Sequence, residues 1–63
     1  MLGIEYCRGE AIIDQETSAA PVVAAAYGKA IQRARKLGAD KVRFIDARGL
    51  EIGVYPVPDV YRA

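Results

Sequence analysis

The chain has 63 residues, a formal net charge of +1, one cysteine and no histidine. A chain of this length forms one domain that buries only about 60% of its unfolded surface, so we expect marginal stability. The lone Cys7 excludes a disulfide framework and fits a reducing compartment, which predicts a cytoplasmic protein. The hydrophobic fraction of 52% is high for so small a monomer. It predicts that apolar surface is covered in a homodimer or by a protein partner.

No segment has the pattern of a signal peptide or a membrane span. The N-terminus lacks the basic residues with which a signal peptide begins, and it has an acidic residue at Glu5. The longest run without a charge, residues 17–28, is rich in alanine and too short to cross a bilayer. We therefore expect no association with a membrane.

Residues 2–14 are predicted as strand. Ile4 and Tyr6 alternate with Glu5 and Cys7, as in a half-buried strand. Gly9 interrupts the pattern and has two interpretations. It marks a bulge in one long strand, or it forms a hairpin turn with the preceding arginine. The two alternatives give a sheet of three or four strands.

The alanine-rich centre is predicted as one long helix. Thr17 or Ser18 is the expected N-cap, Pro21 falls within the first turn and Gly38 ends the helix. At helical spacing one stripe of mostly small residues faces the core, so the helix should lie close to what it covers. The stripe comprises Ala19, Val23, Ala26, Tyr27, Ala30, Ala34 and Leu37.

The C-terminal part is predicted as a hairpin followed by a tail. Residues 41–46 and 50–55 alternate as strands around a turn that ends at Gly49, and Pro56 and Pro58 stop the second strand. The element order is β(β)-α-β-β. This order favours an α+β fold, in which one helix packs across one face of a small antiparallel sheet. The predicted domain covers residues 1–55, with an extended tail over 56–63.

Enzymatic chemistry is not expected. Without histidine the usual nucleophile–base pairs are missing, and no Cys/His cluster offers a zinc site. The small tautomerases share the length and element order, but they need an N-terminal proline where this chain has Leu2. We therefore predict no cofactor, no metal and no small-molecule substrate.

Charge is sorted along the chain. Residues 18–43 carry a net charge of +5, whereas residues 1–17 and 44–63 carry −3 and −1. The electrostatic field of such a charge distribution favours binding to a charged partner. Cations near a helix C-terminus also offset the helix dipole, so a purely solubilising role stays open. The predicted partner-binding residues are the outward-facing side chains of the helix and one glycine: Lys29, Gln32, Arg33, Arg35, Lys36 and Gly28.

Two further surfaces are candidates. Gly28 should face outward beside Pro21, Ala24 and Ala25, where small residues would let a partner approach closely. The alternative is that the helix merely tolerates a glycine at this position, without a role in binding. On the sheet, Leu50, Ile52 and Val54 are expected to face the helix. Arg43, Ile45 and Tyr55 are expected on the opposite, open face, as a surface for self-association.

The stretch Ala30-Ile-Gln-Arg-Ala-Arg-Lys-Leu-Gly-Ala-Asp-Lys-Val-Arg-Phe-Ile-Asp-Ala-Arg-Gly-Leu-Glu-Ile52 resembles the helix-then-hairpin half of small βαββ proteins of phages and mobile elements. This group includes several anti-CRISPR inhibitors. The resemblance covers about a third of the chain and transfers no functional residue. It implies a non-enzymatic protein-binding module that blocks a nucleic-acid-handling complex. The alternative is a small nucleic-acid-binding protein that uses the basic helix on phosphates.

Overall fold

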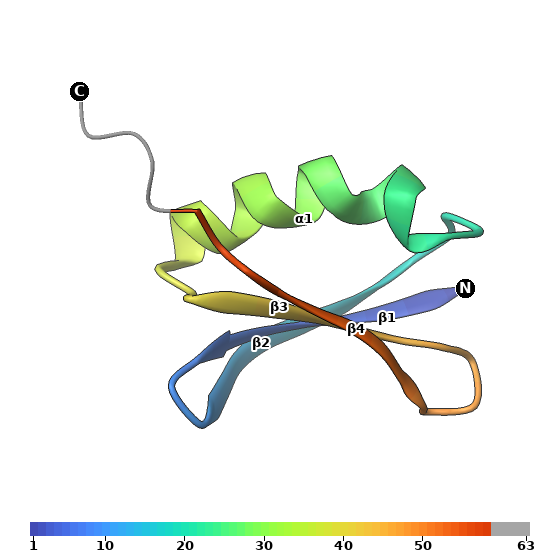
Figure 1. Ribbon diagram of the computed structural model, residues 1–63, viewed down its shortest axis with the longest axis horizontal. Coiled ribbons are helices and arrows are strands. Elements are labelled where there is room, and N and C mark those ends of the chain that lie inside the picture. Colours follow the sequence, from blue (N-terminus) through green and yellow to red (C-terminus); the bar gives the residue numbers. More distant parts are fainter. Residues whose placement is uncertain (59–63) are drawn as a thin grey trace.

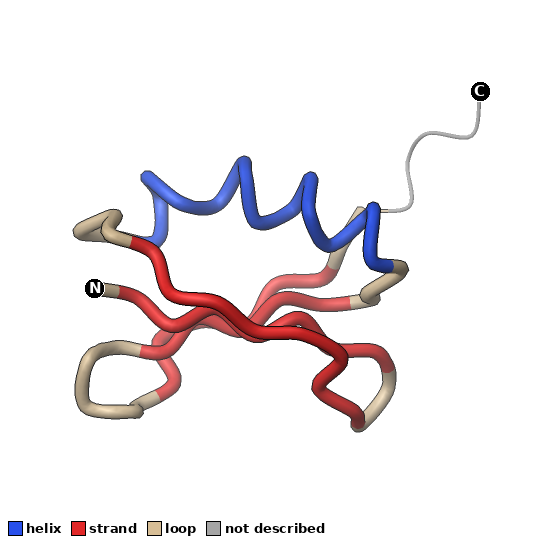
Figure 2. Tube along the Cα trace, turned by 180° about the vertical axis from the view of Figure 1, so that it is seen from behind, coloured by secondary structure: helices blue, strands red, loops and turns tan. Residues whose placement is uncertain are grey.

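The computed structural model describes residues 1–58. The elements are β1 (Leu2–Arg8), β2 (Ala11–Ser18), α1 (Val23–Leu37), β3 (Lys41–Ile45) and β4 (Glu51–Pro56). The four strands form one antiparallel sheet in the order β2-β1-β3-β4. The helix α1 crosses one face of this sheet and leaves the other face open (Figure 1), as the reverse view also shows (Figure 2). The predicted α+β fold is confirmed, and the sheet has four strands.

The N-terminal hairpin decides between the two interpretations of Gly9. Gly9 and Glu10 form a two-residue loop between β1 and β2, and Gly9 adopts a φ of 61°. A glycine with positive φ at the first loop position is typical of a type II′ hairpin turn. A bulge is present as well, but it lies in β2, where Ile13 is the extra residue between the partners of Tyr6 and Cys7.

The helix begins later than predicted. Thr17 and Ser18 belong to β2, where they pair with Gly3 and Leu2 of β1, and the N-cap is Val22, which makes no side-chain capping bond. The predicted N-cap was therefore wrong, because pairing with β1 outweighs the local capping preference. The predicted end is confirmed, since Gly38 closes the helix in the left-handed conformation with a φ of 76°.

The core lies between α1 and the two central strands. It is built from Leu2, Ile4, Tyr6, Val42 and Phe44 on the sheet, with Ala26, Ala30, Ile31 and Ala34 on the helix. Three alanines of the predicted stripe are buried, and Ile31 is a core residue that the stripe missed. Because most helix contacts are alanines, the helix backbone lies close to the sheet. Within residues 1–58 no helix is both long enough and apolar enough to cross a membrane.

The orientation predicted for β4 was wrong. Tyr55 pairs directly with Val42 and faces the helix, where its ring makes edge contacts with Tyr27 and Phe44 at centroid distances of 5.4 and 5.7 Å. Leu50, Ile52 and Val54 are exposed instead. A shift of one residue in a strand exchanges its two faces. Here the pairing with Val42 sets the face of Tyr55.

Glycine at position 53 makes room for the Tyr55 ring. A Cβ atom at Gly53 would lie 2.7 Å from Cε2 of Tyr55, so any larger residue would displace the ring. The sheet also extends slightly beyond the predicted domain boundary. Pro56 belongs to β4, and the Val57 N–H donates a hydrogen bond to the Asp40 carbonyl at 2.9 Å. Residues 59–63 of the predicted tail lie outside the described residues.

Candidate functional site

The exposed face of α1 carries most of the predicted partner-binding residues. Lys29, Gln32, Arg35 and Lys36 are exposed, and so is Gly28. No atom lies within 4 Å of the position that a Cβ would take at Gly28, so this part of the helix surface is open. Their predicted outward placement is confirmed, and their role in binding stays a prediction.

Arg33 has a different environment from the other cations of the helix. Its Nη2 donates a hydrogen bond to Asp14 Oδ2 at 2.8 Å, and its Nε lies 3.8 Å from Glu16 Oε2. The guanidinium carbon also lies 5.8 Å from the centre of the Tyr6 ring. Arg33 therefore joins α1 to β2, and its charge faces two carboxylates there, although 49% of its side chain stays exposed. Sequence spacing could not reveal this pair, because it depends on which part of the N-terminal hairpin lies beside the helix.

The hydrogen-bonding groups around Arg33 have shifted pKa values. The hydrogen bond from Arg33 lowers the pKa of Asp14, and the backbone N–H of Gln15 lowers it further. Burial raises the pKa of Tyr6 well above its usual value, and the hydrogen bond that its hydroxyl donates to Glu16 adds to this effect. The cluster is thus stable in one protonation state at neutral pH: an ionised Asp14 and a protonated Tyr6.

The open face of the sheet holds two of its three predicted residues. Arg43 donates a hydrogen bond from Nε to Glu5 Oε1 at 2.8 Å and lies 3.7 Å from Glu51, and the hydrogen bond to Glu5 raises its pKa. Ile45 lies beside Gly3 on the same face. Tyr55 is absent from it, as described above.

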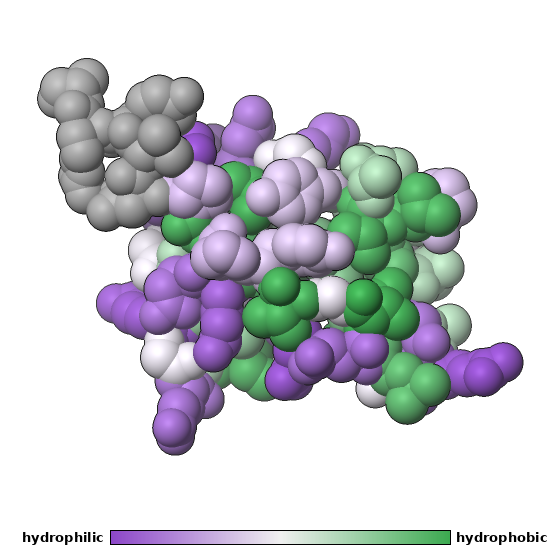
Figure 3. Space-filling view, in the orientation of Figure 1, coloured by the Kyte–Doolittle hydropathy of each residue, from purple (hydrophilic) through white to green (hydrophobic). Residues whose placement is uncertain are grey.

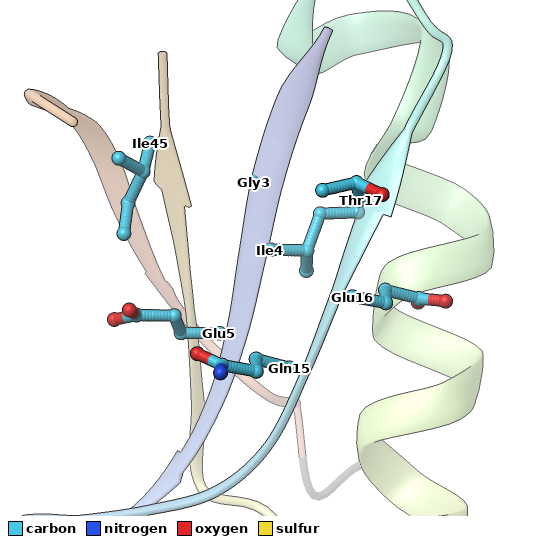
Figure 4. A pocket seen from close by; sticks show the side chains of 7 residues that line it. All are labelled: Gly3, Ile4, Glu5, Gln15, Glu16, Thr17 and Ile45. Atoms are coloured by element: carbon cyan, nitrogen blue, oxygen red, sulfur yellow. The ribbon is translucent and has the colours of Figure 1, made fainter. Parts of the chain in front are cut away.

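A shallow hollow of about 420 Å³ lies on this open face. Gly3 has no side chain and forms its floor, and Thr17 and Ile45 stand on either side of it (Figure 4). Glu5 and Gln15 lie at one end of the hollow and point away from α1 (Figure 4). The hollow has no charged group at its floor, and its lining makes no set of groups with catalytic geometry.

A second hollow lies between α1 and β2 and was not predicted. It has a volume of about 340 Å³. Its walls are mostly small and apolar, with Lys29 on the helix side and Glu16 on the strand side. The lining residues are Ile4, Glu16, Thr17, Ser18, Ala19, Ala20, Ala25, Ala26, Lys29 and Ala30. We call this hollow the α1–β2 groove. Sequence reasoning missed it because Thr17 and Ser18 were assigned to the helix.

Apolar side chains are exposed along β4. Leu50, Ile52 and Val54 keep 57%, 46% and 43% of their surface accessible. The space-filling view shows hydrophobic side chains, in green, at the surface on the side of the molecule where β4 lies (Figure 3). An exposed apolar patch commonly marks a surface of association.

Comparison with known proteins assigns no relative. No protein-family model, no curated protein and no solved structure matches the chain. Among residues 1–58 no group of three or more Cys, Asp or Glu side chains is placed to hold a metal ion. The site is therefore interpreted from its own geometry and charge.

Proposed function

We propose that the chain is a non-enzymatic protein-binding module that grips an acidic surface of its partner with the exposed face of α1. The observation that carries this proposal is the composition of that face. Ala24, Ala25 and Gly28 form a smooth open patch, and Lys29 and Lys36 follow it on the same exposed side. Small residues permit close approach of another backbone, and the two lysines supply the charge that selects an acidic partner.

Two observations favour a protein over a nucleic acid. The aromatic rings of residues 1–58 lie on the helix or on the helix side of the sheet, so the open face offers no platform on which bases would stack. Beside the basic face, Asp14 and Glu16 present carboxylates and hold Arg33. A nucleic acid carries phosphates along its whole length, so one lying across the helix would also meet this negative charge, whereas an acidic patch on a protein can be confined to the side of Lys29 and Lys36.

The class of partner comes from the resemblance to small phage and mobile-element proteins. It implies a protein of a nucleic-acid-handling complex, such as a CRISPR effector, that this chain inhibits. An inhibition assay with a reconstituted CRISPR effector tests this narrower proposal. Loss of target binding at stoichiometric amounts of the chain would support it, and an unaffected effector would contradict it for that effector type.

The binding face itself is tested by nuclear magnetic resonance. We expect a synthetic glutamate-rich peptide, titrated into the isotope-labelled chain at physiological salt, to shift the amide signals of Gly28, Lys29 and Lys36. Lys29→Glu should weaken the binding about tenfold or more, because a repulsive charge replaces an attractive one. Arg48→Glu makes the same charge change in the exposed β3–β4 turn and should leave it nearly unchanged. Equal effects of both variants would contradict a specific binding face.

A further inference from the structure

The two outer strands of the sheet, β2 and β4, differ in the backbone groups that they present. Backbone groups of alternate residues in an antiparallel strand point to opposite sides. The Val57 N–H donates to the Asp40 carbonyl, which identifies one hydrogen-bonded residue pair between β4 and β3. The register of the three strand pairs extends the alternation from this pair to all four strands. By this alternation the backbone groups of Gln15 and Thr17 point away from β1, and those of Val54 point away from β3.

The β4 edge is short and interrupted. The bulge at Ile52 breaks the regular pairing on one side of Val54, and Pro56 on the other side has no N–H to donate. Bulges and prolines are devices that protect an outer strand against pairing with another chain. The β4 edge is therefore a poor template for an added strand.

The β2 edge is longer and more regular. From Asp14 to Ser18 it pairs with β1 without interruption. Thr17 directs both its N–H and its carbonyl outward, and Gln15 directs its carbonyl outward. The Gln15 N–H donates instead to Asp14 Oδ1 at 2.9 Å. Three backbone groups along this edge are thus in position to pair with an extended segment.

The α1–β2 groove lies on the helix side of the same strand. Side chains of an extended segment alternate between the two faces of the sheet that it joins. A strand added to β2 would therefore direct every second side chain toward α1, beside the groove. Ala25 and Ala26 leave space there, and Lys29 stands at its helix wall.

We propose that an extended segment of a partner protein adds to the sheet at β2, pairs with Gln15 and Thr17, and places a small apolar side chain in the α1–β2 groove. An acidic residue of the segment lies beside Lys29. This inference rests on the proposed function and specifies its binding mode, since Lys29 belongs to both surfaces. A second copy of the chain fits this edge poorly. Antiparallel pairing of two β2 strands about Glu16 would set the two Glu16 carboxylates opposite each other, which is unfavourable.

The test uses a synthetic peptide of repeating Val-Thr-Asp-Thr, labelled for fluorescence anisotropy. Its valine and aspartate side chains fall on the same face of an extended strand, so both can lie on the helix side of β2. Thr17→Pro removes an outward N–H without touching the pairing with β1, and Ala25→Leu fills the groove. We expect each change to weaken peptide binding about tenfold or more. Val54→Pro and Ala47→Leu are the matched controls, because they make the same changes on the other edge and in the exposed β3–β4 turn. Both should leave the affinity nearly unchanged.

Hydrogen exchange supplies a second readout. Saturating peptide should slow exchange of the Thr17 amide, while the Val54 amide should exchange as before. If Lys29→Glu abolishes peptide binding but Thr17→Pro and Ala25→Leu do not weaken it, strand addition is wrong and the proposed function stands. If the peptide shows no saturable binding to the intact chain, or if the controls weaken binding equally, strand addition is also wrong. Circular dichroism melting of each variant separates these outcomes from loss of the fold.

Discussion

Arg33 on the helix and Asp14 on the outer strand β2 are joined by a hydrogen-bonded ion pair with 2.8 Å between Nη2 and Oδ2. This pair links α1 to a strand that the helix otherwise covers little, because the helix packs mainly on β1 and β3. Arg33 also lies over the ring of Tyr6, and Tyr6 donates a hydrogen bond to Glu16. One guanidinium thus connects three residues of the N-terminal hairpin to the helix.

Reversal of Arg33 should therefore lower stability more than reversal of another exposed cation of the helix. Arg33→Glu places a third carboxylate beside Asp14 and Glu16 and removes the cation over Tyr6. Lys36→Glu, on the outer face of the helix, is the matched control. We expect a clearly lower melting temperature for Arg33→Glu than for Lys36→Glu by circular dichroism. Equal melting temperatures would show that the ion pair does not hold the helix against β2.

The same pair predicts how stability depends on pH. Because the pKa of Asp14 is lower in the folded chain than in the unfolded chain, its contribution is present above about pH 4 and is lost as the pH falls through the lowered value. The free energy of unfolding should decrease over this acidic range. In Asp14→Asn this decrease should be smaller, which urea titrations at several pH values will measure. An unchanged pH profile would contradict the assigned role of the pair.

Substitution by alanine should change the free energy of unfolding in opposite directions at Gly53 and Gly28. Gly53→Ala forces a Cβ against the Tyr55 ring, which is confined by Phe44 and Tyr27, and should cost about 1–3 kcal/mol. Gly28 lies in the exposed helix with open space around it, so Gly28→Ala should stabilise the fold by roughly 1 kcal/mol. Denaturant unfolding measures both. A neutral Gly53→Ala would mean that the ring moves aside without loss of its contacts.

Self-association is predicted from the exposed apolar side chains of β4. We expect a homodimer at micromolar concentration, held through Leu50, Ile52 and Val54 rather than through the set of Arg43, Ile45 and Tyr55 that the sequence suggested. Val54→Lys should shift the equilibrium to the monomer in sedimentation experiments, because it places a charge in the apolar contact. A stable 6.8 kDa monomer of the unaltered chain at these concentrations would contradict this prediction.

The sequence predicted the parts of the fold that local chemistry determines. Gly38 marked the end of the helix, and alternation located the strand-forming segments but left their number at three or four. Turn residues and apolar periodicity act over short distances. It failed where pairing over long sequence distances decides the outcome. Thr17 and Ser18 look like helix caps, yet they pair with Gly3 and Leu2 at the other end of the hairpin.

The candidate site was predictable to the same extent. The outward placement of Lys29 and Lys36 follows from helical periodicity. The pairing of Arg33 with Asp14 depends on which part of the N-terminal hairpin lies beside the helix, and the groove depends on where β2 ends. The sequence showed neither. The orientation of Tyr55 depends on its cross-strand partner, Val42, and not on alternation within β4 alone.

The claim that the basic face of α1 binds protein and not nucleic acid is tested most directly by titration with random-sequence duplex DNA over a range of salt concentrations. Arg33 is paired with Asp14. The other exposed cations of this face are Lys29, Arg35 and Lys36. If all three contacted phosphates, the logarithm of affinity would fall against the logarithm of salt with a slope of about −2 to −3. We predict negligible DNA binding at physiological salt, under conditions in which the glutamate-rich peptide still binds. Tight DNA binding with that slope would contradict the account.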